Sequence, residues 1–244
     1  MYDDFASLYD LFVDWPNRLR NELPHLLRLG VGRPGTSIVD TACGTGHHAR
    51  AWAEQGCRVA ALDASAEMIR HAKQLDADAK VTWHVGEFAD VPATGDADAV
   101  VCLGTSLPHV ENKAEYLEAL RSFRNALRPD GLLVVHSRNL HKTLVDGDRF
   151  LPPLVRSEPG GTILFWRFYD IVAQDALDFN LTIFRESTNW KHQVLTSRLS
   201  VVSGNELIRY ASDVGFTETN LYGHLDGRPY DASSSPDMVL VAKA

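Results

Sequence analysis

The chain has 244 residues, enough for one domain with a full hydrophobic core, and its 45% hydrophobic and 23% charged residues are ordinary for a globular protein. A formal net charge of −8 without a basic run disfavours DNA and RNA partners, whose phosphates would be repelled. No signal peptide opens the sequence, and no apolar stretch reaches membrane-spanning length, so we expect a cytoplasmic protein that engages no membrane.

The cysteines and histidines do not form a metal-binding pattern. Cys43, Cys57 and Cys102 each lie in or beside an apolar run, which indicates small buried hydrophobes rather than a disulfide set or zinc ligands. His47 and His48 are adjacent, and adjacent residues on a helix point apart. We therefore expect no metal.

The first 140 residues alternate between strand-like and helix-like segments. Apolar runs of strand length lie at residues 37–42, 58–62, 81–85, 98–103 and 131–137. The helices expected between them are His47–Gln55, which Gly56 ends, a helix capped by Ser65 with Met68, Ile69, Ala72 and Leu75 on its apolar face, and Lys113–Arg128, which ends before Pro129. This alternation predicts an α/β fold with a doubly wound, mostly parallel sheet.

The rest of the chain has a different pattern. Residues 141–160 are rich in proline and glycine and are expected to form a loop. Three β-rich runs follow at Thr162–Val172, Leu177–Glu186 and Trp190–Ser200, separated by short polar breaks that are typical of an antiparallel meander. A helix at residues 204–214 and a hairpin-like strand pair at 216–223 and 238–242 bring the main sheet to seven strands.

These segments predict two parts. Residues 1–140 and 201–244 form the main domain, and residues 141–200 form an inserted antiparallel β lid over the active site. In a sheet of this kind a ligand lies at the carboxyl ends of the strands.

A glycine-rich turn follows the first predicted strand. Residues 37–46 read Ser-Ile-Val-Asp-Thr-Ala-Cys-Gly-Thr-Gly, and glycine lets the backbone take positive φ and approach a ligand closely. Asp63 ends the second strand, 17 residues after Gly46, near the spacing at which an acid binds ribose hydroxyls. The pattern predicts a nucleotide-like cofactor. The spacing Gly44-x-Gly46-x-x-Ala49 also satisfies the looser dinucleotide fingerprint, so spacing does not name the cofactor.

The residues themselves resemble the class I S-adenosylmethionine-dependent methyltransferases. The resemblance is carried by residues 40–46, by Ala61-Leu62-Asp63-Ala64-Ser65-x-x-Met68, and by three segments further on, residues 85–88, 101–106 and 127–133. It implies a Rossmann-like methyltransferase fold, S-adenosyl-L-methionine as the cofactor and a small-molecule methyl acceptor. The oligomeric state stays open, and a homo-oligomer is compatible with the sequence.

The resemblance also assigns residues to the cofactor. Asp63 would accept hydrogen bonds from the ribose hydroxyls of the cofactor, and Glu87 would accept one from its adenine amine. Arg18 or Arg20 would bind the carboxylate of the cofactor. Tyr9, on an N-terminal lid helix, would close over the cofactor. The whole expected set is Tyr9, Arg18, Asp40, Ala42, Gly44, Gly46, Asp63, Ala64, Met68, Glu87, Phe88, Leu103 and His109.

The expected acceptor site follows from a narrower resemblance. Residues 134–139 and 102–109 are similar to glycine N-methyltransferases and their glycine/sarcosine relatives, which implies that Arg138 clamps a substrate carboxylate and that Thr105 and Ser106 help position the acceptor. The alternative for Arg138 is a salt bridge to an acid of the inserted sheet. The sequence departs from that family at Thr105, at Leu140-His141 and at Phe179, which replaces an expected tyrosine.

Several functions remain open at this stage. N-methylation of a glycine-like amino acid is the leading hypothesis, and O-methylation of a natural-product or carboxylate metabolite is its first alternative. An NAD-binding oxidoreductase would need a catalytic Tyr-x-x-x-Lys or a second substrate domain, and a non-catalytic binding module would not need an intact glycine loop with Asp63 and Glu87. His136 is either a base or an ordinary strand histidine, and no general base is assigned.

Overall fold

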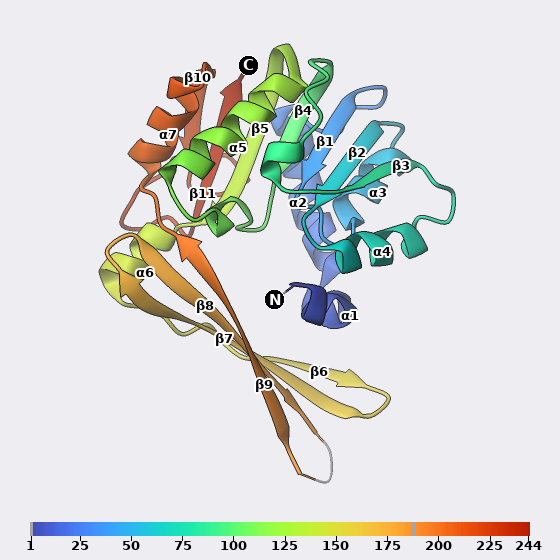
Figure 1. Ribbon diagram of the computed structural model, residues 1–244, viewed down its shortest axis with the longest axis vertical. Helices are drawn as coiled ribbons and strands as arrows, with labels where there is room; N and C mark the ends of the chain where they lie inside the picture. The colour runs from blue at the N-terminus through green and yellow to red at the C-terminus, as the bar shows by residue number, and fades with distance from the viewer. Residues whose placement is uncertain (1, 187–188) are drawn as a thin grey trace.

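The computed structural model describes residues 2–186 and 189–244, with side chains from Phe5 onward. Within these residues the main sheet has seven strands in the order β10-β11-β5-β4-β1-β2-β3 (Figure 1). Its strands are β1 (Ser37–Thr41), β2 (Arg58–Asp63), β3 (Val81–Val85), β4 (Ala97–Cys102), β5 (Leu127–Arg138), β10 (Thr217–Tyr222) and β11 (Asp237–Lys243). β1 to β5 pair in parallel, and β11 is antiparallel to both β5 and β10. This confirms the predicted doubly wound sheet.

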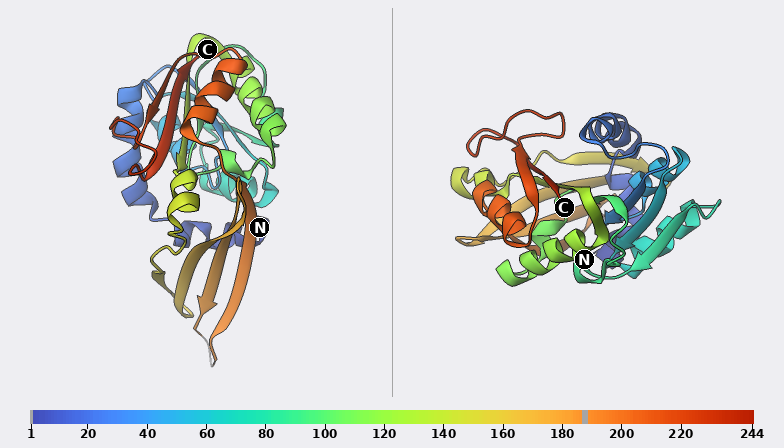
Figure 2. Two further views of the ribbon diagram at one scale, coloured as in Figure 1. Left: turned by 90° about the vertical axis from the view of Figure 1, so that its left-hand side faces the viewer. Right: turned by 90° about the horizontal axis from the view of Figure 1, so that it is seen from above.

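Helices cover both faces of the main sheet (Figures 1 and 2). One face packs against α5 (Lys113–Ala126) and α7 (Gly204–Asp213), where Tyr116, Leu120 and Phe123 are buried against strand residues. The other face packs against α2 (Trp15–Leu29), α3 (His47–Glu54) and α4 (Ala66–Leu75). Both cores use the apolar stripes that helical periodicity predicts, and burying them is the main favourable contribution to stability.

A second, antiparallel sheet lies beyond the carboxyl ends of the parallel strands (Figure 1). The described residues place its strands in the order β6 (Leu154–Glu158), β7 (Gly161–Ala173), β8 (Ala176–Arg185) and β9 (Lys191–Ser200). Helix α1 (Tyr2–Phe12) lies between the two sheets, and its Phe5 and Leu8 are buried with residues of β7 to β9. The first helix is therefore part of a core and is not a detached terminal cover.

The predicted loop at residues 141–160 is wrong in two places. Helix α6 (Leu140–Asp146) forms because the Asn139 side chain accepts a hydrogen bond from the Lys142 N–H and caps it. Strand β6 forms because Leu154 to Glu158 pair with β7 across a turn that Gly161 makes at φ +128°. Pro152 and Pro153 lie before β6 and Pro159 follows it in the turn to β7, so no proline interrupts the strand.

Two expectations about helices also need correction. α5 ends at Ala126 and not at Arg128, because Leu127 already pairs with Ala97 of β4, and a residue before Pro129 is biased away from helical backbone. Leu75 of α4 is 44% exposed, although its spacing placed it on the apolar face. The buried residues of α4 are Met68, Ile69 and Ala72, so the apolar stripe is covered only as far as Ala72.

The three cysteines are free and buried, as predicted for small hydrophobes. None of the described helices is long and apolar enough to cross a bilayer.

The two leucines give a matched test of this packing. Leu120→Ala should lower the free energy of unfolding by about 2–5 kcal/mol, because a fully buried leucine leaves both lost transfer energy and a cavity. Leu75→Ala should change it by no more than about 1 kcal/mol, since the side chain is half-exposed. Urea denaturation followed by circular dichroism measures both. Equal losses in the two variants would contradict the packing described here.

Candidate active site

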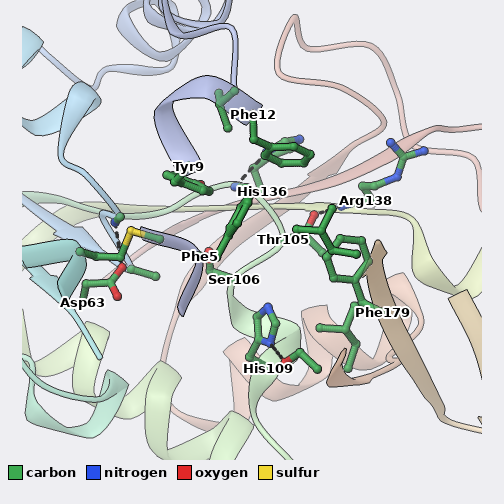
Figure 3. A pocket seen from close by; sticks show the side chains of 18 of the residues that line it. Phe5, Tyr9, Phe12, Asp63, Thr105, Ser106, His109, His136, Arg138 and Phe179 are labelled. Carbon is green, nitrogen blue, oxygen red and sulfur yellow. Dashed lines mark hydrogen bonds between the residues drawn. The ribbon is translucent and has the colours of Figure 1, made fainter. Parts of the chain in front are cut away.

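A cavity of about 620 Å³ opens at the carboxyl ends of the parallel strands, between the main sheet and the second sheet. It is bounded by the loops after β1 to β5, by α1 and by the inner face of β7 to β9 (Figure 3). Most of the expected site residues line it, namely Tyr9, Arg18, Ala42, Gly44, Asp63, Ala64, Met68, Glu87, Phe88, Thr105, Ser106, His109 and Arg138. Asp40, Gly46 and Leu103 are not among its lining residues.

Asp63 ties the end of β2 to the glycine turn after β1. One carboxylate oxygen accepts a hydrogen bond from the Gly44 N–H at 2.8 Å, and the other accepts one from the Ser65 N–H at 2.9 Å. Ala42 and Gly44 take positive φ of 57° and 58°. The acid therefore holds the backbone of the turn against the cavity wall as well as facing the cavity itself.

The two glycines of the turn have different roles. A Cβ at Gly44 would lie 3.1 Å from the Tyr9 ring, so this position keeps the cavity floor open under the N-terminal helix. A Cβ at Gly46 would lie 2.2 Å from the Trp83 ring. Gly46, at φ +75°, is therefore required by the turn and by packing, and its expected contact with a cofactor remains a prediction.

Asp40 and Leu103 lie beneath the cavity wall. Asp40 is buried in β1, and burial together with the negative charge of Asp63 raises its pKa to about 8, against the opposing charge of Arg18. Asp40 is thus mostly protonated at neutral pH. Leu103 is buried, and its carbonyl accepts a hydrogen bond from the Ser106 hydroxyl at 2.8 Å.

The N-terminal segment is fastened to the glycine turn by polar contacts that the sequence did not reveal. Asp10 accepts hydrogen bonds from the Thr45 hydroxyl at 2.6 Å and from the Trp15 indole N–H at 2.8 Å. His47 lies 3.2 Å from the same carboxylate and stacks on the Trp15 ring. Tyr9 lies over Gly44 in this arrangement, and its closing over a cofactor remains a prediction.

Arg18 lines the cavity, whereas Arg20 is exposed and is not among the lining residues. The Arg18 guanidinium donates to Glu22 at 3.0 Å, and the other Glu22 oxygen is 2.9 Å from His48 Nε2. Burial opposes ionisation of Glu22, but the His48 contact and the Arg18 charge prevail and lower its pKa to about 2. Arg18 is therefore oriented by a carboxylate that stays ionised.

Glu87, Phe88 and Met68 form the other end of the cavity, after β3 and on α4. Glu87 is exposed, and its backbone N–H donates to Asp90 at 2.8 Å. Phe88 meets the buried Phe123 edge to face at 5.7 Å between ring centroids. Phe88 thus packs against the core and also lines the cavity.

The ends of β4 and β5 meet at Thr105 and Arg138 (Figure 3). Thr105 has φ +71°, its N–H bonds the His136 carbonyl at 3.1 Å, and its hydroxyl accepts from the Arg138 backbone N–H at 2.9 Å. Within the described residues, the Arg138 guanidinium makes no ion pair with an acid of the inserted sheet. The salt-bridge alternative for Arg138 therefore has no support in the structure.

Two histidines face the cavity near these strand ends. The His109 Nδ1 lies 3.0 Å from the Ser197 hydroxyl of β9, and burial lowers its pKa to about 4, so it is neutral at physiological pH. His136 Nε2 lies 3.6 Å from Asp237 of β11. Asp237 also lines the cavity and was missed, because an acid at the start of a strand has no distinctive sequence pattern.

The inner face of the second sheet contributes most of the residues that sequence reasoning missed. Arg167 and Tyr169 of β7, Leu181 of β8 and Leu199 of β9 line the cavity, with Phe5 and Phe12 of α1. Phe179, noted in the sequence only as a departure, lies on the same wall. One signal was present: Ile163, Phe165, Arg167 and Tyr169 share one face of a strand. An arginine on an otherwise apolar face indicates a functional position.

Comparisons with known proteins agree with this geometry. Residues 38–131 match the family model described as "Methyltransferase domain". The glycine/sarcosine N-methyltransferase of Halorhodospira halochloris is 31% identical over 152 residues, which cover 59% of this chain and 56% of the relative. The dTDP-3-amino-3,6-dideoxy-alpha-D-glucopyranose N,N-dimethyltransferase of Streptomyces fradiae is 36% identical over 136 residues, covering 54% and 52%. The chain spans about half the length of these curated relatives.

The whole fold is shared with solved methyltransferases. The CcbJ methyltransferase of Streptomyces caelestis aligns with a TM-score of 0.77 and 21% identity, covering 100% of this chain and 97% of that one. The likeness extends over both sheets and shows a common fold.

Asp63 allows a direct test of the cofactor end. Asp63→Ala should weaken binding of S-adenosylhomocysteine by about 1.5–3 kcal/mol for each charged hydrogen bond lost. Asp78→Asn, on the surface beside Lys80, should leave binding unchanged. Titration calorimetry measures both, and parental affinity in the Asp63 variant would remove this residue from the site.

Asp40 predicts a pH dependence of stability. Because its pKa is raised from 3.8 to about 8, the folded chain holds a proton there that the unfolded chain releases between about pH 4 and pH 8. The free energy of unfolding should fall as pH rises through this window. Asp40→Asn should flatten that fall, whereas Asp96→Asn, at an exposed acid, should not. Urea denaturation at several pH values decides, and parallel curves for the parent and Asp40→Asn would refute the assignment.

Proposed function

We propose that this chain, which belongs to the class I S-adenosylmethionine-dependent methyltransferases, transfers a methyl group to the amine of a small acidic metabolite, with a glycine-like amino acid as the leading candidate. The observation that carries the proposal is Arg138. It is the last residue of β5, lines the cavity and has no acidic partner in the part of the chain that the structure describes. A guanidinium in that position is suited to a carboxylate, which it binds through two parallel hydrogen bonds.

The other end of the cavity is suited to the cofactor. Asp63 would bind the ribose hydroxyls of the cofactor, Glu87 would bind its adenine amine, and Arg18 would bind its carboxylate. Gly44 leaves space for the cofactor that a Cβ atom would fill. When bound, S-adenosylmethionine supplies a sulfonium methyl group, whose carbon–sulfur bond breaks, with its electrons going to sulfur, as the acceptor nitrogen forms the carbon–nitrogen bond.

The residues of this chain contribute positioning and exclusion of water. Arg138 would fix the distance and direction of the attacking amine, which lowers the barrier more effectively than proton removal would. Tyr9, Phe5 and Phe12 cover the cavity from α1, and an enclosed site strengthens such polar contacts. The methylated ammonium loses its extra proton to solvent, and no general base is assigned.

A second acceptor class has its own support. The Streptomyces fradiae relative is named for a nucleotide-linked aminosugar, and the cavity wall on the second sheet carries another arginine, Arg167. An amine on a sugar nucleotide is therefore the second candidate. O-methylation has weaker support, because both curated relatives are named as N-methyltransferases.

A transfer screen tests the proposal. The purified chain would be incubated with methyl-labelled S-adenosylmethionine and with glycine, sarcosine, other amino acids, their amides, an aminosugar nucleotide and carboxylic acids without an amine. Mass spectrometry identifies the labelled product. Labelling of an amine-bearing acid is expected, and labelling of acceptors without an amine would overturn the proposal.

Arg138→Lys should lower kcat/KM for the labelled acceptor at least about tenfold, because lysine keeps the charge but loses the planar fork. S-adenosylhomocysteine affinity should not change, since Arg138 is assigned to the acceptor. Arg149→Lys is the matched control, because Arg149 pairs with Asp170 outside the cavity. An unchanged kcat/KM in the Arg138 variant would contradict the proposal that Arg138 binds the acceptor carboxylate.

A further inference from the structure

Two arginines in the cavity lack a negative partner. Arg18, Arg138 and Arg167 all line it, and Arg18 pairs with Glu22 at 3.0 Å. Across residues 2–186 and 189–244, neither Arg138 nor Arg167 has an ion pair with a carboxylate. The cavity therefore holds two guanidinium charges that the protein does not neutralise.

Arg167 is the more constrained of the two. It lies on β7 between Phe165 and Tyr169 on the inner face, with its guanidinium over the Phe12 ring at 5.3 Å. Its Nε is buried and has no hydrogen-bond partner within the described residues. An unsatisfied buried donor on a charged group is costly, so its presence calls for an explanation, and a bound anion in the cavity would supply the missing partner.

The guanidinium groups of Arg138 and Arg167 line the same cavity. Burial lowers the pKa of Arg167, and the nearby charges of Arg138 and Arg156 lower it further, while Tyr169 opposes them. Arg156 donates to the carbonyls of Leu11 and Phe12 and is not among the cavity-lining residues. Arg138 and Arg167 thus line the same cavity, and the charge of Arg138 contributes to the lowered pKa of Arg167.

The acids of the cavity are engaged elsewhere. Asp63 accepts from the Gly44 and Ser65 N–H groups, Glu22 contacts Arg18 and His48, and Asp237 lies beside His136. Glu87 lies at the opposite end, after β3. A single substrate carboxylate would neutralise one guanidinium and leave the other without a partner, close to Phe12, Phe179 and Leu181.

We propose that Arg167 binds a second anionic charge of the methyl acceptor, so that the acceptor is an amine with two negative charges near Arg138 and Arg167. This inference rests on the proposed function and narrows its substrate class. Two carboxylates on one amino acid, a phosphate ester and a sugar nucleotide diphosphate share this chemistry, because each offers two oxyanions to two planar forks.

Titration calorimetry on the full chain saturated with S-adenosylhomocysteine tests the inference. The probes are glycine, with one carboxylate, aspartate, with two, O-phosphoserine and dTDP. At least one doubly charged probe should bind about tenfold more tightly than glycine. That preference identifies which source of the second charge the site accepts.

Arg167→Gln should abolish that preference while leaving glycine and S-adenosylhomocysteine affinities unchanged. Arg167→Lys should retain part of it, because it restores a charge without the fork. Arg149→Gln is the control, at an arginine that precedes β6 and pairs with Asp170 of β7 outside the cavity. Thermal unfolding confirms that each variant is folded.

Two results would overturn the inference: an unchanged preference in Arg167→Gln, or no doubly charged probe that exceeds glycine on the parent chain. Failure of the proposed function looks different, since the parent would then bind no S-adenosylhomocysteine or label no amine.

Discussion

The site depends on the carboxylate of Asp63, which accepts hydrogen bonds from the Gly44 and Ser65 N–H groups. These bonds join the end of β2, the turn after β1 and the cap of α4 in one arrangement. Because hydrogen bonds to an ionised acceptor are strong, the turn is held in its positive-φ conformation before any ligand arrives. The cavity is therefore preorganised at its cofactor end.

The negative charge of Asp63 also affects the protonation of the neighbouring Asp40. Asp40 lies beneath the turn, and burial together with the charge of Asp63 keeps it mostly protonated at neutral pH. Asp63 accepts two backbone hydrogen bonds, whereas the carboxyl of Asp40 is buried beneath it and its pKa is raised. Arg18 lies between this region and Glu22, and its charge is stabilised by a carboxylate of very low pKa.

The acceptor end is built on a different principle. Its walls come from α1 and from the second sheet, whose inner face is apolar apart from a few polar side chains. Specificity in such a pocket arises from the charges placed in it, since a polar group without its partner is penalised much more than a missing methylene. The charges of Arg138 and Arg167 therefore indicate the chemical class of the acceptor better than the size of the cavity does.

Much of the fold followed from the sequence because its signals are local. Strand lengths, helix stripes, the Ser65 cap and the glycine turn are set by neighbours within a few residues, and the predicted strands of the main sheet lie within a few residues of the observed ones. The cofactor end could also be predicted, because Asp63 and Glu87 lie at the ends of consecutive strands whose carboxyl ends must meet at one edge.

The features that only the tertiary structure decided depend on long-range pairing. The register of β7 with β8 turns Arg167 inward, β6 forms only against β7, Asp10 reaches Thr45 across 35 positions of the chain, and burial raises the pKa of Asp40. The sequence by itself determined the parallel sheet and its cofactor turn, whereas the acceptor wall required the packing of the second sheet and α1 onto that sheet, since side chains distant in sequence acquire their environment only there.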